Sequence, residues 1–120
     1  MKRDLSVGSL HIELLRESPE QLRMVWRGRS EDRDPADYLN PFLISSIEVL
    51  SDELLVCDFR ELEYINSSTI PPILRMIKKL HIDGKSARIV YDSNSSWQTA
   101  SFTAFRIITD TMNLIEISGE

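Results

Sequence analysis

A cluster of polar side chains stands between an apolar run and an amphipathic segment in the middle of the chain. Asn66, Ser67, Ser68 and Thr69 follow one another there. Each could accept a hydrogen bond from an amide in the first turn of a helix, so the cluster could cap the helix that follows. Capping needs only one or two of them, and a helix amino terminus also attracts phosphate. The pattern favours capping and leaves phosphorylation of a hydroxyl open.

A phosphate on one of these hydroxyls would add about −1.5 to −2 charge units and several acceptor oxygens. Such a change is large enough to reverse the polarity of a small docking surface. Pro71 and Pro72 come next, and neither has an amide proton that could bind the phosphate. We therefore expect a phosphate here to act mainly by repelling a partner.

Residue types that catalyse reactions or bind metals are scattered along the chain. His11 and His81 lie far apart without a metal-ligand spacing, and Cys57 has no second cysteine to share a metal or a disulfide. Because Cys57 sits in an apolar run, we expect a buried side chain rather than a reactive thiol. The 4 glycines form no phosphate-binding loop. We expect neither an enzyme nor a cofactor or metal site.

The composition sets the broad class of the protein. The chain has 120 residues, of which 42% are hydrophobic and 28% charged, as in a single globular domain. Its net charge of −5 has the wrong sign for binding nucleic acid. No apolar run approaches the roughly 20 residues that span a bilayer, and the first residues lack a signal core. We expect one domain over residues 1–120, cytoplasmic, with no nucleic-acid or membrane partner.

Periodicity in the first half of the chain predicts two strands, a helix and a third strand. Alternating apolar residues predict a hairpin of strands at Leu10–Arg16 and Leu22–Gly28. Helical spacing predicts a helix from Pro35 to about Ser51, with a kink or a restart at Pro41. The apolar run Leu54–Cys57 predicts a central strand covered on both faces. Residues 61–69 are then expected to form a loop.

The second half continues with two helices that each precede a strand. The clearest amphipathic helix begins at Ile70 and ends near Asp83–Gly84, and the next strand covers Ala87–Tyr91. Leu114–Ile117 closes the chain as a last strand. The final helix is expected to bury one face that leaves out Phe102, formed by Trp97, Ala100, Ser101, Ala104, Phe105 and Ile108.

This order of elements predicts an α/β sandwich. Its sheet is expected to be mixed but mostly parallel, with about five strands and with helices packed on it, because the later strands are joined by right-handed helical crossovers. Ligands and partners of such sheets bind at the carboxyl ends of the strands. That rule points to the segment after Phe59.

The same segment resembles a known family signature. Asp58–Ile70 is similar to the signature of STAS domains, the anti-sigma-factor antagonist family, in which a strand ending in aspartate precedes an Asp-Ser-Ser-Gly motif. The first serine of that motif aligns with Ser67. The resemblance implies a STAS-like fold in which a GHKL-type serine kinase phosphorylates Ser67 and a PP2C-type phosphatase restores it. It also implies that only the unmodified form binds its target.

Two departures from that signature resemble the SiaC-type biofilm regulators, a STAS-like group with Tyr-x-Asn-Thr-Ser-Ser at this place. Asn66 replaces the usual aspartate and Thr69 the usual glycine. Gly28-Arg29-Ser30 is also similar to a segment of that group. The likeness runs from about Gly28 to Leu80 and implies a diguanylate cyclase or an anti-sigma-factor-type kinase as the target. It implies partner contacts through Arg29, Ser30, Asn66, Ser68 and Thr69.

A second class of function stays open at this point. Ser93–Ser96 stands at the amino end of the last predicted helix and could hold a small ligand such as a nucleotide, or could simply cap that helix. A ligand-binding sensor module would show a thermal shift with nucleotides. The sequence also leaves open whether Ser67, Ser68 or Thr69 is modified.

Overall fold

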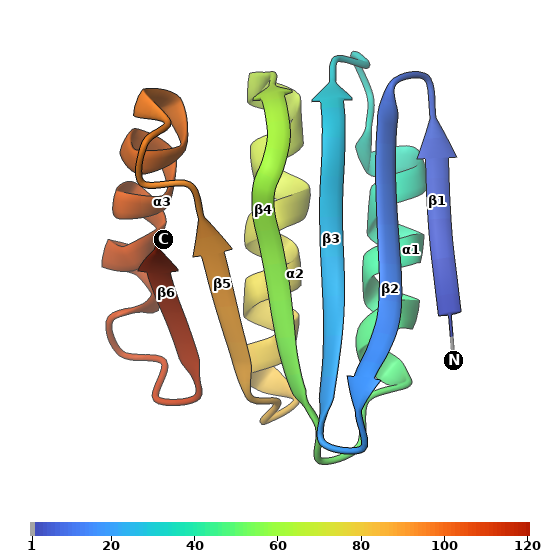
Figure 1. The fold of residues 1–120 in the computed structure, drawn as a ribbon, viewed down its shortest axis with the longest axis vertical. Helices are drawn as coiled ribbons and strands as arrows, with labels where there is room; N and C mark the ends of the chain where they lie inside the picture. The colour runs from blue at the N-terminus through green and yellow to red at the C-terminus, as the bar shows by residue number, and fades with distance from the viewer. Residues whose placement is uncertain (1) are drawn as a thin grey trace.

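The computed structural model describes residues 2–120, with side chains from residue 3 onward. They form a six-stranded sheet, three α-helices and a short 3₁₀ helix (Figure 1). The strands are β1 (Lys2–Val7), β2 (Leu10–Ser18), β3 (Gln21–Ser30), β4 (Leu54–Ile65), β5 (Ala87–Tyr91) and β6 (Ile115–Gly119). The helices are α1 (Ala36–Glu48), the 3₁₀ helix η1 (Ser67–Thr69), α2 (Ile70–Ile82) and α3 (Ser96–Thr109).

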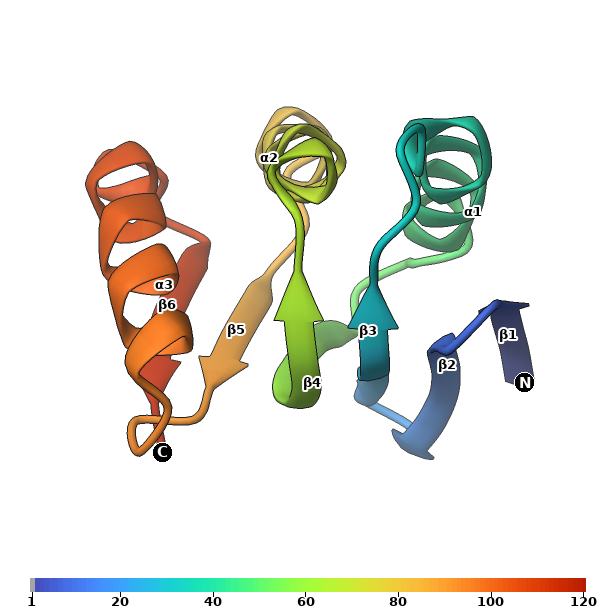
Figure 2. The ribbon, with the colours of Figure 1, turned by 90° about the horizontal axis from the view of Figure 1, so that it is seen from above.

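The strands lie side by side in chain order, which decides where the helices go. β1, β2 and β3 pair antiparallel, whereas β3 to β6 pair parallel through crossovers that contain α1, α2 and α3. Crossovers between parallel strands are right-handed, and each of these adds a strand on the same side of the last. All three helices therefore cover the same face of the sheet, and the other face is open (Figure 2). The predicted α/β fold with a mixed, mostly parallel sheet is confirmed.

Coverage of one face corrects the expected environment of β4. Leu55 and Cys57 point toward the helices and belong to the core, while Val56 and Asp58 alternate with them on the open face. The predicted coverage on both faces is thus wrong. Cys57 is fully buried, and this burial raises the pKa of its thiol to about 12, which keeps it protonated. The expectation of a buried cysteine is confirmed.

A chain of aromatic rings joins the sheet to α3. The Phe59 ring lies 4.9 Å from Trp26 and 4.8 Å from Phe102, measured between ring centroids. The predicted buried face of α3 is confirmed at Phe105, and Trp97 packs against the core while half-buried. It is wrong at Ala100, Ala104 and Ile108, which are exposed, and at Phe102, which is fully buried. Together with Phe102 and Phe105, α3 buries Gln98 and Thr109.

Three further expectations about elements are corrected. β1 was not predicted, because an edge strand with the sequence KRDLSV has little apolar character of its own. Pro41 lies inside one continuous helix, so the predicted restart there is wrong. β4 runs on to Ile65, which places Glu61 and Glu63 on a strand instead of in the expected loop.

The end of β4 extends beyond β5, so its backbone groups on that side need other hydrogen-bond partners. β5 pairs with β4 only as far as Asp58, and beyond that point no strand lies on this side of β4 to bond to the carbonyl groups of Phe59 and Leu62. Nε2 of Gln98 donates to both carbonyl oxygens, at 2.7 and 2.8 Å. Oε1 of Gln98 accepts from the amide of Asp92 at 2.8 Å. One buried side chain thus fastens the end of β4 to α3 and β5.

Removing this side chain's polar end should destabilise the fold. Gln98→Leu leaves two carbonyl oxygens and one amide without partners, and we expect it to lower the free energy of unfolding by about 2–4 kcal/mol in urea denaturation. Gln21→Leu is the matched control, because Gln21 bonds only to the exposed Glu17, and we expect a change within about 0.5 kcal/mol. Equal stability of the two variants would contradict the role given to Gln98.

Candidate functional site

Ser67 opens the 3₁₀ helix η1, directly after the end of β4. Asn66 precedes it in an extended conformation and caps this helix: Oδ1 of Asn66 accepts from the amide of Thr69 at 3.1 Å and from its hydroxyl at 2.6 Å. Capping by the predicted cluster is therefore confirmed, with Asn66 as the capping residue. The hydroxyl of Ser67 takes no part in it.

Ser30, Asn66 and Thr69 form a set of contacts that we call the Asn66 clamp. The hydroxyl oxygens of Ser30 and Thr69 lie 2.7 Å apart, and both side chains are buried. The amide of Asn66 donates to the Ser30 carbonyl oxygen at 3.1 Å, and Nδ2 of Asn66 donates to the carbonyl oxygen of Asp32 at 2.6 Å. The clamp ties the end of β3 to the start of η1. In this structure the buried contact between Ser30 and Thr69 stabilises the connection from β4 to η1.

The three candidate hydroxyls differ in accessibility. Ser67 is exposed, Ser68 is half-buried, and Thr69 is fully buried with its hydroxyl hydrogen-bonded in the clamp. A modifying enzyme needs an accessible oxygen. Ser67 meets that requirement best, and its assignment as the modified residue stays a prediction.

The backbone after Ser67 offers little to a phosphate. The amide of Thr69 is taken by Asn66, and the amide of Ile70 donates to the Ser67 carbonyl oxygen. The next two residues are Pro71 and Pro72, which have no amide proton. A phosphate on Ser67 would therefore find few free amides in this turn.

Arg29 and Tyr64 lie together on the open face of the sheet beside this site. The Arg29 guanidinium carbon lies 4.7 Å from the centroid of the Tyr64 ring, and Nε of Arg29 donates to Oε1 of Glu31 at 2.9 Å. A shift in strand register after Gly28 sets Arg29 opposite Tyr64. Tyr64 is 40% exposed. Tyrosine and arginine are the side chains that contribute most in protein interfaces. Arg29 was predicted from the sequence as a partner contact, whereas Tyr64 was not, although it begins the motif Tyr64–Thr69.

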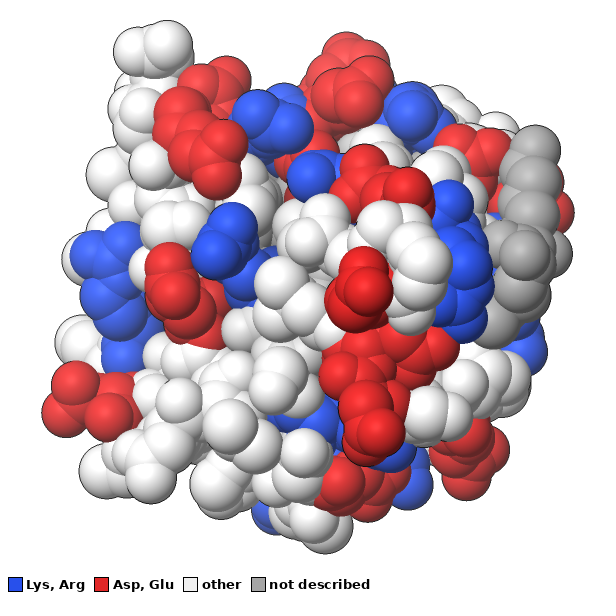
Figure 3. Space-filling model, turned by 60° about the horizontal axis from the view of Figure 1, so that its bottom comes forward, with Lys and Arg blue, Asp and Glu red and all other residues white. Residues whose placement is uncertain are grey.

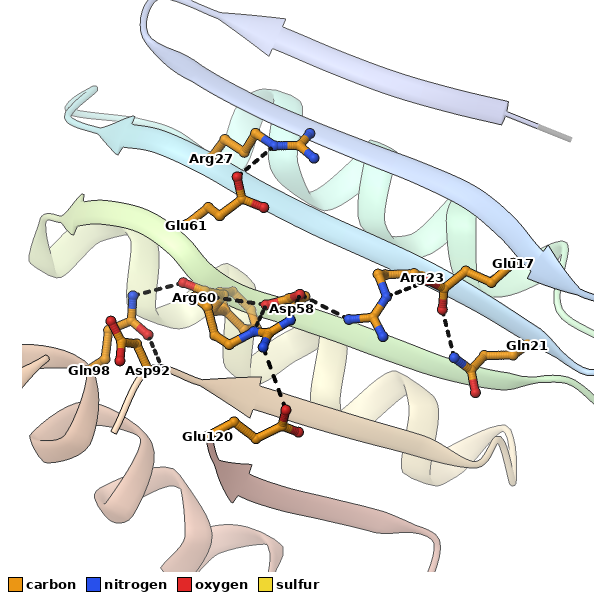
Figure 4. A network of polar contacts seen from close by, with 11 residues as sticks. Glu17, Gln21, Arg23, Arg27, Asp58, Arg60, Glu61, Asp92, Gln98 and Glu120 are labelled. Atoms are coloured by element: carbon orange, nitrogen blue, oxygen red, sulfur yellow. Dashed lines mark hydrogen bonds and ion pairs between the residues drawn. The ribbon is translucent and has the colours of Figure 1, made fainter. Parts of the chain in front are cut away.

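The rest of the open face carries arginines and carboxylates that form ion pairs with one another. Figure 3, which views the molecule obliquely from its lower end, shows both signs of charge interspersed. At the centre of the open face the Asp58 carboxylate accepts from Arg23 at 2.9 Å and from Arg60 at 2.8 and 3.0 Å (Figure 4). Burial alone would raise the pKa of Asp58, but hydrogen bonds and charge from Arg60 and the charge of Arg23 outweigh it and lower the pKa. Such an internally paired face is typical of a solvated surface.

The second candidate loop, residues 92–96, is satisfied by its own contacts. Oγ of Ser95 accepts from the amide of Gln98 at 3.4 Å and caps α3. Oδ1 of Asp92 accepts from the amide of Asn94, and Oγ of Ser93 donates to the carbonyl oxygen of Glu120. Capping is thus confirmed here, and the loop adds no support to a nucleotide site. Among the described residues, no three His, Cys, Asp or Glu side chains are arranged to hold a metal ion.

Comparison with known proteins shows what this fold is like. No family model matches the chain, and no curated protein matches it. Among solved structures, a chain in the crystal structure of the diguanylate cyclase SiaD in complex with its activator SiaC, from Pseudomonas aeruginosa, matches with a TM-score of 0.66. The match covers 98% of this chain and 99% of that chain at 18% sequence identity. The two chains share a fold over their full lengths. None of the described helices is long and apolar enough to cross a membrane.

The clamp yields a prediction about Thr69. Thr69→Val keeps the shape of the side chain but leaves the buried Ser30 hydroxyl without its partner and removes one of the two hydrogen bonds that Oδ1 of Asn66 accepts. We expect a loss of about 1–3 kcal/mol in the free energy of unfolding. Ser68→Ala, in the neighbouring position, should change stability by less than about 0.5 kcal/mol. Urea denaturation of both variants measures the difference, and an unaffected Thr69→Val variant would argue against the clamp.

The Asp58 pair predicts a pH dependence. Because the pKa of Asp58 is lower in the folded protein, its contribution is present above its unfolded pKa of about 3.9 and is lost as pH falls through the folded value. Asp58→Asn should therefore cost about 1–3 kcal/mol at pH 7 and progressively less below about pH 4.

Thermal melts of wild type and Asp58→Asn from pH 7 down to about pH 2 test this dependence. The exposed Glu61, which pairs with Arg27, supplies the control variant Glu61→Gln. We expect this variant to stay within about 0.5 kcal/mol of wild type. A difference between wild type and Asp58→Asn that stays constant over the whole pH range would refute the assignment.

Proposed function

We propose that the chain is a regulatory binding protein that is switched by phosphorylation of Ser67. The unmodified form binds a target protein, either a diguanylate cyclase or an anti-sigma-factor-type kinase. A GHKL-type serine kinase phosphorylates Ser67 and releases the target, and a PP2C-type phosphatase resets the switch. In this role the protein regulates its target and does not itself catalyse a reaction.

One observation carries the proposal: an exposed hydroxyl stands on a rigid support at the edge of the sheet. Ser67 is exposed. Asn66 before it and Thr69 two residues after it are held by the clamp at the end of β3. A serine kept only for capping would turn its oxygen to the helix amides, but Asn66 already fills that role. The hydroxyl of Ser67 is thus free to face another protein.

The shared fold supports the choice of a diguanylate cyclase as target. SiaC is an activator that forms a complex with the diguanylate cyclase SiaD, and the matched chain of that structure has this fold over its full length. The residues that resemble SiaC-type regulators, Gly28–Ser30 and Tyr64–Thr69, lie side by side because β3 pairs with β4. We infer that a target would contact this edge, with Arg29, Tyr64 and Ser68 around Ser67.

The surroundings of Ser67 explain why a phosphate would release the target. The loop after β3 is bonded to this edge through the backbone carbonyl oxygen of Asp32, and its exposed side chains at residues 31–34 comprise three carboxylates and one arginine. A dianion next to these carboxylates would lose its hydration when a target covers it. With no amides folded around it, it gains little in return. The buried clamp residues Ser30 and Thr69 would then act indirectly, by keeping the edge in shape.

Two variants of Ser67 test the proposal. Ser67→Ala keeps a small neutral side chain and should bind a purified diguanylate cyclase from the same genome about as tightly as wild type. Ser67→Asp places a charge at the edge and should weaken binding by at least roughly tenfold, which is about 1.4 kcal/mol. Isothermal titration calorimetry gives both affinities, and the same mixtures report cyclase activity.

The control is Ser51→Asp, since Ser51 is also exposed but lies at the opposite end of β4. It should bind like wild type. Equal affinities of the Ser67→Ala and Ser67→Asp variants would refute the switch. Capture of interacting proteins from a native lysate, followed by mass spectrometry, extends the test to an anti-sigma-factor-type kinase. Phosphate found on Ser68 or Thr69 instead of Ser67 would also contradict the proposal.

A further inference from the structure

Exposed apolar side chains gather at the end of the molecule opposite to Ser67. Six large hydrophobic side chains are exposed among the described residues, and four of them belong to the end of α2, the end of α3 and the turn before β6. α2 and α3 run in the same direction, so these three segments lie at one end of the sheet (Figure 1). The four are Ile82 (67% exposed), Ile107 (78%), Ile108 (49%) and Leu114 (48%).

This end of the molecule carries an uncharged area. Figure 3 shows a broad region free of charged side chains in its lower left part, over the helix side of the molecule. Single exposed hydrophobic residues are ordinary on protein surfaces, but a group of them indicates an interaction site. The charged side chains next to this apolar group indicate which partner could bind there.

One flank of α3 supplies these charges. Thr103, Arg106, Ile107 and Asp110 lie along the same side of the helix, with i, i+3, i+4 and i+7 spacing, and line a shallow groove of about 320 Å³. Nη2 of Arg106 donates to the carbonyl oxygen of Ile117 on β6 at 3.1 Å, which leaves other donors of the guanidinium at the surface. Asp110 forms no ion pair with any described residue.

We propose that this α3 flank binds a second copy of the same chain. Arg106 and Asp110 are one helical turn apart on the same side of α3. When two α3 helices meet antiparallel about a two-fold axis between these positions, each Arg106 faces Asp110 of the other copy. Ile107 of both copies then lies near the axis. A surface that carries both members of an ion pair around an apolar centre is complementary to itself, as a two-fold interface requires.

The position of the flank is compatible with the proposed switch. Ser67 follows the carboxyl end of β4, whereas Ile107 and Asp110 lie at the end of α3 that is near the start of β6 (Figure 1). Both copies of a dimer would keep the Ser67 edge open. The flank offers four side chains, fewer than the roughly 20–30 residues per partner of a standard interface, so we expect a dissociation constant of the order of ~10–100 µM.

The mass of the purified chain in solution tests the dimer. Sedimentation equilibrium from about 5 µM to about 500 µM should show the apparent mass rising from the 13.8 kDa of one chain toward twice that value. Ile107→Glu should shift the dissociation constant upward by at least roughly tenfold. Val49→Glu changes another exposed aliphatic residue, at the end of α1, and should dimerise like wild type.

Exchanging the charges of Arg106 and Asp110 distinguishes this interface from any other. Asp110→Arg sets arginine against arginine across the axis, and Arg106→Asp sets carboxylate against carboxylate, so we expect each variant alone to be monomeric. Mixing the two restores both attractive pairs and should restore a dimer. Thermal melts of Arg106→Asp show whether losing the contact to Ile117 unfolds it, and Ile107→Glu answers the question independently.

The outcomes divide clearly between support and refutation. Wild type that stays monomeric at about 500 µM would overturn the proposal, as would Ile107→Glu that still dimerises. A dimer that both charge variants leave intact would place the interface elsewhere on the chain and would equally overturn it. None of these results bears on Ser67, because the switch is measured with a different protein and at the opposite end.

Discussion

The architecture depends on β4, which extends beyond its neighbour β5. β4 extends seven residues past its last pair with β5, from Asp58 to Ile65, and its carbonyl groups there would be left without partners. Gln98 satisfies two of them, and pairing with β3 holds the other side of the strand. Because of this support the chain turns from sheet to helix beyond the edge of β5, where Ser67 is accessible. A shorter β4 would place the same residues between neighbouring loops.

A second constraint follows from the order of the strands. Since every parallel strand is added on the same side, the helices cover one face, and the opposite face has to be stable in water. The sequence meets this need with arginines and carboxylates in facing positions, and Asp58 at the centre is held by Arg23 and Arg60. These pairs leave the face little capacity to attract another charged protein. The surfaces available for binding are therefore the carboxyl edge of the sheet and the ends of the helices.

Sequence patterns predicted the elements whose own residues carry the signal. The strand Ala87–Tyr91 was predicted with its observed bounds, and the helix from Ile70 was predicted to within about two residues at its end, because both have regular apolar periods. The extension of β4 was missed because bulges between Asp58 and Glu61 and between Leu62 and Tyr64 break the alternation of the strand. β1 was missed because only its pairing with β2 makes it a strand.

The same distinction applies to the site. Asn66 could be recognised as a capping residue from its neighbours in sequence. The burial of Ser30 and Thr69 could not, because it arises where β3 and β4 pair across 39 residues of chain. In the same way, Gln98 has a polar side chain in a position that helical periodicity reserves for apolar residues. Its burial depends on two carbonyl groups from another strand, which no local pattern contains.

The two proposed surfaces have a consequence together that neither has alone. A dimer joined at α3 would present two Ser67 edges, and a target with two sites would bind the second edge at a high effective concentration. One phosphate would then break only one of the two contacts and leave the target attached more weakly. Complete release would require both copies to be modified, so the response to kinase activity would be steeper than that of a single site. A target with only one site would show no such difference, which makes its stoichiometry the property that decides how sharply the switch responds.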